Sequence, residues 1–149
     1  MDAASGCRRG EILALTWNDL TLDATPGVVS VTKSLEQTKA GLRIKPPKNG
    51  KPRTLPLPAV LVEGLKEHQT RQNEYRQQFG PDYRADLNLV FATPEGNYLK
   101  PDTVTSAACL LARKCGLKGI GLHSLRHSHG SQRGAGTIGV VDPLIGAIV

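Results

Sequence analysis

The sequence is poor in cysteine and aromatic residues, and it contains no long apolar run. Its three cysteines are odd in number and lack CxxC spacing, which disfavours a disulfide framework or a zinc site and indicates a reducing, cytoplasmic location. Aromatic side chains make up 4% of the chain, too few for a protein that binds single strands by stacking. No stretch reaches the roughly 18 apolar residues of a membrane span, and residues 1–6 do not resemble a signal peptide. We therefore expect neither secretion nor a membrane partner.

Acidic residues are scarce in two stretches of the chain. Residues 33–53 contain seven lysines and arginines against one acidic residue, Glu36. Residues 100–133 contain six against Asp102, together with three histidines. The formal net charge is +6 and the isoelectric point is about 9.5. This distribution favours a polyanionic partner such as nucleic acid.

Hydrophobic periodicity and turn signals predict a single domain of the α+β class, mainly helical, with a small three-stranded antiparallel sheet. We expect helices over residues 11–15, 59–79 and 102–114, and a further helix that Ser124 caps. The expected strands are residues 28–32, 42–45 and 53–57, the last two separated by the Asn49-Gly50 turn signal. A chain of 149 residues is long enough for one ordinary core.

Three separated motifs carry the chemistry: GCRRGE at residues 6–11, PKNGKPR at 47–53 and HSLRH at 123–127. Gathered by folding, two arginines, a lysine and a histidine form a pocket suited to a phosphodiester whose charge grows during a reaction.

In order and spacing these motifs resemble the catalytic domain of the tyrosine recombinases, the phage integrase family. The family's first arginine lies in a Thr/Ser-Gly-x-Arg-x-Gly/Ser-Glu helix entrance, which residues 5–11 match, so this role falls to Arg8. Its lysine precedes an Arg-x-x-Pro-Leu strand, as Lys48 precedes Arg53, with Lys45 and Lys51 as alternatives. The His-x-Leu-Arg-His box is matched by His123, Leu125, Arg126 and His127.

The resemblance implies DNA strand exchange in which a tyrosine hydroxyl attacks a phosphate of double-stranded DNA, without metal or cofactor, giving a 3′-phosphotyrosyl enzyme. Arg8 and Arg126 would hold the non-bridging oxygens, because arginine keeps its charge and offers a fork of donors. Lys48 would protonate the departing 5′ oxygen, and His123 would assist proton transfer. Glu11 and His127 are expected to support these groups. The DNA backbone is expected to meet residues of the basic hairpin, namely Lys45, Lys51 and Arg53.

Two parts of the family pattern do not occur. A second His or Trp is expected about twenty residues after the box, followed by the nucleophilic tyrosine, whereas Tyr75, Tyr83 and Tyr98 all precede the box. We therefore expect a catalytically and C-terminally incomplete domain over residues 1–149, in which residues 1–131 match the family and residues 132–149 form a divergent tail. Family members act as tetramers on DNA, so other recombinase protomers are expected partners.

Three alternatives remain open. The chain could be a non-catalytic basic DNA-binding module that pairs with an intact recombinase, or a decayed integrase fragment. A metal-dependent phosphoesterase could use the histidines, since His123 and His127 lie one helical turn apart. No carboxylate or cysteine lies near them in sequence, so we predict no metal site.

Overall fold

The computed structural model describes residues 7–47 and 50–114. These residues fall into two compact units. One runs from Arg8 to Pro101, and the other contains, among the described residues, Cys7 and Asp102 to Lys114. The helix α3 (Pro101–Lys114) lies almost wholly in the second unit, close to its expected bounds of 102–114. The site and the core described below belong to the first unit.

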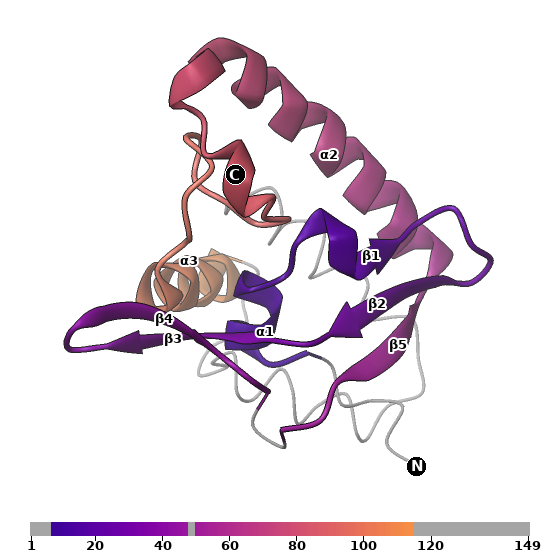
Figure 1. Cartoon of the computed structure of the whole chain (residues 1–149), viewed down its shortest axis with the longest axis horizontal. Helices are drawn as coiled ribbons and strands as arrows, with labels where there is room; N and C mark the ends of the chain where they lie inside the picture. Colours follow the sequence, from indigo (N-terminus) through magenta and orange to yellow (C-terminus); the bar gives the residue numbers. More distant parts are fainter. Residues whose placement is uncertain (1–6, 48–49, 115–149) are drawn as a thin grey trace. The chain divides into compact units, whose positions relative to one another are not determined.

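The first unit combines helices with antiparallel strands, as expected for the α+β class (Figure 1). Its helices are α1 (Arg9–Leu13) and α2 (Ala59–Phe79). Short 3-10 turns occur at Trp17–Asp19, Gly80–Asp82 and Ala85–Leu87. The strands are β1 (Leu20–Thr21), β2 (Gly27–Val31), β3 (Ser34–Thr38), β4 (Gly41–Lys45) and β5 (Arg53–Leu57). In the described part of the chain, no helix is both long and apolar enough to cross a lipid bilayer.

The strands pair differently from the expected arrangement. A three-stranded sheet has the order β1-β2-β5, in which Val29 of β2 lies between Leu20 and Leu55. Residues 42–45, expected in this sheet, instead belong to β4, which pairs only with β3 as a separate hairpin. Figure 1 shows this hairpin extending away from the three-stranded sheet.

Local chemistry explains the separate hairpin. Thr38 accepts a hydrogen bond from the Ala40 N–H at 3.2 Å and donates to the Gly41 carbonyl at 2.9 Å, and Gly41 has a φ of 126° that favours glycine. This turn brings β4 back against β3. Pro46 and Pro47 then follow β4 and cannot donate ladder hydrogen bonds, so the pairing ends before the chain reaches β5.

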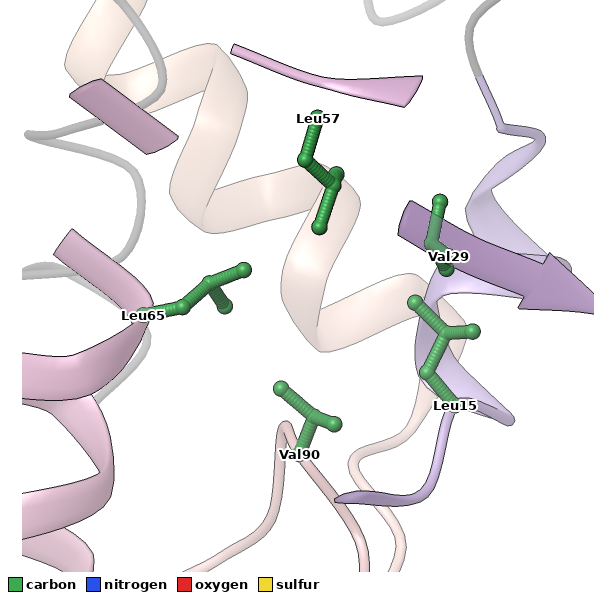
Figure 2. Packing of buried hydrophobic residues seen from close by; sticks show 5 residues of the cluster. All are labelled: Leu15, Val29, Leu57, Leu65 and Val90. Carbon is green, nitrogen blue, oxygen red and sulfur yellow. The ribbon is translucent and has the colours of Figure 1, made fainter. Parts of the chain in front are cut away.

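A core of aliphatic side chains joins the sheet to α2 (Figure 2). Val29 and Leu57 come from adjacent strands, and Leu65 comes from α2. Leu15 follows α1, and Val90 follows the 3-10 turn at Ala85–Leu87. Figure 2 shows these five side chains converging. Each fully buried Val or Leu contributes about 1.5–3 kcal/mol relative to an exposed one.

Helix α2 has the expected bounds, but the sequence did not reveal its most buried polar residue. His68 is 1% exposed and stacks on Phe91 with ring centroids 5.6 Å apart. Its neighbour Gln72 accepts a 2.7 Å hydrogen bond from the Trp17 indole and donates to the Leu89 carbonyl at 3.0 Å. These contacts fix α2 to the chain on either side of the core. Trp17 itself is partly buried and packs against the core.

Candidate functional site

Arg8 lies at the entrance of α1, the position that the first motif predicts. Its backbone is extended, with φ −69° and ψ 151°, and its N–H donates to Oε2 of Glu11 at 2.7 Å. The guanidinium Nη1 donates to Oε1 of the same carboxylate at 3.2 Å. Within residues 7–47 and 50–114, the Nε and Nη2 of Arg8 have no hydrogen-bond partner. The side chain is 31% exposed, so the charged guanidinium is held in place and still has donors that can reach a ligand from solvent.

The short helix α1 holds Arg8 in place by packing tightly against β3. A Cβ atom built on Gly10 would collide with the Leu35 carbonyl oxygen and lie 2.7 Å from the Ser34 Oγ. Leu13, one turn later, is buried. Only glycine therefore allows this approach, which explains the glycine two residues after Arg8.

Glu11 is fully buried and serves two arginines. Besides Arg8, it accepts hydrogen bonds from Arg53, whose Nη1 lies 3.0 Å from Oε1 and whose Nη2 lies 2.7 Å from Oε2. Burial alone would raise the pKa of Glu11. The hydrogen bonds and charge of Arg53, together with those of Arg8, outweigh burial and hold that pKa below its ordinary value. Glu11 is thus an ionised carboxylate with both oxygens engaged.

The residues expected to contact DNA occupy three different settings. Arg53, 29% exposed, begins β5 and directs both Nη donors to Glu11. Lys45 ends β4 and forms an ion pair with Glu36, which also pairs with Arg43 at 2.8 Å. The hydrogen bonds from these two cations lower the pKa of Glu36. Lys51 is exposed and forms no ion pair with any described residue.

The remaining predicted catalytic residues lie outside the described residues. These are Lys48, His123 and Arg126, together with the supporting His127. On either side of Lys48 and Asn49, the Gly50 N–H donates to the Pro47 carbonyl at 2.7 Å. In the described segments, no group of three or more His, Cys, Asp or Glu side chains is placed to hold a metal ion.

The sequence indicated both Glu11 and Arg53 but not their contact. The sequence signal for a buried carboxylate was the position of Glu11 directly before the apolar residues Ile12 and Leu13. In a helix as short as α1, Glu11 is buried together with Leu13. A buried carboxylate needs compensating charge, and the Arg8 side chain supplies only one hydrogen bond of 3.2 Å, so a second cation is expected. Which of several basic residues in the 33–53 stretch provides the second cation depends on how the strands pair, and the sequence does not specify that pairing.

A partly exposed arginine, fixed by a buried carboxylate in a basic α+β domain, has the charge and donors that a phosphate or another anion requires. The model of the phage integrase family matches residues 3–133. The chain therefore belongs to the phage integrase family, and the resemblance noted in the motifs is confirmed.

Similar proteins agree with this assignment. A tyrosine recombinase XerC-like protein of Caldanaerobacter subterraneus subsp. tengcongensis is 26% identical over 140 residues, covering 86% of this chain and 35% of that protein. This chain thus spans about a third of the curated relative's length.

Two solved structures share the fold. The Tn1549 transposon integrase in complex with a circular intermediate DNA has a TM-score of 0.64 and 20% identity, covering 86% of this chain and 42% of that one. The same integrase in complex with transposon right end DNA has a TM-score of 0.57 and 14% identity, covering 99% and 42%.

Proposed function

We propose that this chain takes part in site-specific recombination or integration by breaking and rejoining double-stranded DNA, and that Arg8 binds the phosphate at the reacting position. The observation that carries this proposal is the Arg8–Glu11 contact at the first family motif, inside a match that covers residues 3–133. The cytoplasm is the proposed compartment, because the proposed target is DNA and an odd number of cysteines without CxxC spacing fits a reducing environment.

The geometry supports a clamp rather than an acid or base at Arg8. Its guanidinium keeps its charge throughout a reaction and retains Nε and Nη2 for the non-bridging oxygens of a phosphodiester. In the proposed mechanism Arg126 supplies the second fork, Lys48 protonates the leaving 5′ oxygen and His123 assists proton transfer. The attacking group of the family is a tyrosine hydroxyl. Since Tyr75, Tyr83 and Tyr98 all precede the box, we propose that these 149 residues do not form the phosphotyrosyl bond unaided.

Binding to a 30-base-pair duplex across a salt series tests the proposal. Fluorescence anisotropy should give a log Kd that rises linearly with log salt, because phosphate contacts release counterions. Arg8→Ala should reduce that slope by the amount expected for the loss of about one phosphate contact. Arg76→Ala is the matched control, since it removes the same charge from an exposed position of α2. Absence of binding at low salt would contradict the proposal and favour a decayed fragment.

A second candidate function is a non-catalytic DNA-binding module that assembles with intact recombinase protomers. It requires only a basic surface, and residues 33–53 carry seven lysines and arginines against one acidic residue. A mixture with an active recombinase distinguishes the two. If this chain acts as a catalytic protomer, the Arg8→Ala variant should no longer affect cleavage by the mixture. If it acts only as a binding module, the variant should keep its effect on cleavage wherever its duplex affinity is preserved.

A further inference from the structure

Arg8 and Arg53 share the carboxylate of Glu11. Arg8 lies three residues from Glu11 in sequence, and Arg53 lies forty-two residues from it. Oε2 of Glu11 receives the Arg8 N–H and the Arg53 Nη2, both at 2.7 Å. Oε1 receives the Nη1 groups of Arg8 and Arg53, at 3.2 and 3.0 Å. Arg53 therefore makes the fork, with one donor on each oxygen, while the Arg8 side chain has a single, longer bond.

We propose that Arg53 is a positioning residue: it acts through Glu11 to keep the Arg8 guanidinium available to a phosphate. This inference rests on the proposed function of Arg8 and assigns Arg53 a role other than direct contact with the DNA backbone.

The reason is competition for a buried carboxylate. Glu11 is 0% exposed, and its negative charge must be compensated within the protein. With Arg53 in place, one donor of Arg8 is enough. If Arg53 were removed, Arg8 would be the one described cation left in contact with Glu11, and its strongest available geometry would be a fork on Glu11. The guanidinium donors of Arg8 would then bind Glu11 and would no longer be available to a phosphate.

The backbone of Arg53 strengthens this role. Arg53 pairs with Val31 at the end of the β2–β5 ladder, and Val31 is fully buried. The guanidinium therefore extends from a strand that cannot shift without disturbing the core. Its fork connects α1 to β5, the strand entered from the loop that carries Lys48, and so links the first two motifs of the sequence.

The test measures duplex affinity for Arg53→Ala in two backgrounds. We expect Arg53→Ala to weaken binding about tenfold in the otherwise unchanged protein, and by less than about twofold when Arg8 is already alanine. A phosphate contact made by Arg53 itself would give the same loss in both backgrounds, and that result overturns the inference.

The conservative variant sharpens the test. Arg53→Lys keeps the charge but not the fork, so we expect it to bind DNA nearly as weakly as Arg53→Ala. Full recovery of affinity by lysine would overturn the inference, because a point charge suffices for a phosphate contact. If Arg53→Ala does not fold by far-ultraviolet circular dichroism, Arg53→Lys in both Arg8 backgrounds decides the question alone.

Thermal unfolding without DNA separates this inference from the proposed function. Arg53→Lys should lower the Tm by several degrees in the unchanged protein, and by clearly less when Glu11 is glutamine. If the unchanged protein fails to bind DNA, the proposed function fails, and this cycle still decides whether Arg53 acts on Glu11. Equal Tm losses with glutamate and glutamine would show that it does not.

Discussion

The Nε2 atom of His68 lies 2.6 Å from the Val90 carbonyl oxygen, so the ring is protonated at Nε2 and donates there. Its Nδ1 atom is buried without a hydrogen-bond partner among the described residues. Burial lowers the pKa of His68, the nearby charge of Arg71 lowers it further, and the Val90 hydrogen bond only partly opposes them. The folded protein therefore holds His68 neutral inside the α2 interface.

This arrangement predicts a loss of stability in mild acid. Because the pKa of His68 is lower in the folded state than in the unfolded state, the unfolded chain takes up the proton first as the pH falls. The free energy of unfolding should be highest above the unfolded value of about 6.5 and should fall as the pH drops below it. Urea denaturation between pH 5 and 8 measures this effect.

The matched variant is His68→Gln, which retains an N–H group but cannot be protonated. At pH 7.5 it should lower stability by about 0.5–1.5 kcal/mol through the lost contact with Phe91, and it should flatten the pH dependence between pH 5 and 7. The other three histidines are present in both proteins and are thereby controlled. An unchanged slope in His68→Gln would assign the pH dependence to one of them.

The close approach of α1 to β3 predicts the effect of Gly10→Ala. The new Cβ would force the Leu35 carbonyl and the helix apart, so we expect a loss of about 1–3 kcal/mol in the free energy of unfolding. Because Arg8 moves with α1, duplex affinity should fall as well. Glu63→Ala, at an exposed position of α2, is the comparison and should change stability by less than about 0.5 kcal/mol. A Gly10→Ala protein as stable as this control would contradict the contact.

The parts of the fold that the sequence predicted well are those with strong local signals. Helix α2 begins after Pro58 and ends before Gly80 and Pro81, and these residues bound it at both ends. The strand β3 was not predicted, and residues 42–45 were expected in the three-stranded sheet, because β3 reads Ser-Leu-Glu-Gln-Thr, which has only one apolar position. Strand pairing is a non-local choice, and a polar strand carries little information about its partner.

The candidate site shows the same division. The position of Arg8 at the start of α1 follows from six adjacent residues, and the structure confirms it. The contact between Glu11 and Arg53 depends on β5 pairing with β2 rather than with β4, so no local pattern could specify it. Burial of His68 is also a tertiary effect, because a histidine on a polar helix gives no sign that Phe91 and Trp17 will cover it.

The proposed chemistry predicts the consequence of losing Arg8 in a protein that carries the family's tyrosine nucleophile. There, Arg8→Ala should slow cleavage of a nicked target about 10²- to 10³-fold, because one fixed donor set at the developing charge is lost. The present 149 residues should give no covalent adduct with the same DNA on denaturing electrophoresis. A robust adduct would show that one of Tyr75, Tyr83 or Tyr98 can act as the nucleophile.

The β3–β4 hairpin predicts an effect of opposite sign. Glu36 binds both Arg43 and Lys45 at partly exposed positions of the hairpin, where water and salt already weaken the pairs. Glu36→Gln should free both cations for phosphate while removing a repelling charge. We therefore expect duplex binding to tighten several-fold at low salt, and the slope of log Kd against log salt to steepen by about one to two contacts. Glu63→Gln makes the same charge change on α2 and should alter affinity less. Equal effects of the two variants would mean that only total charge matters, and that the hairpin does not lie along the DNA.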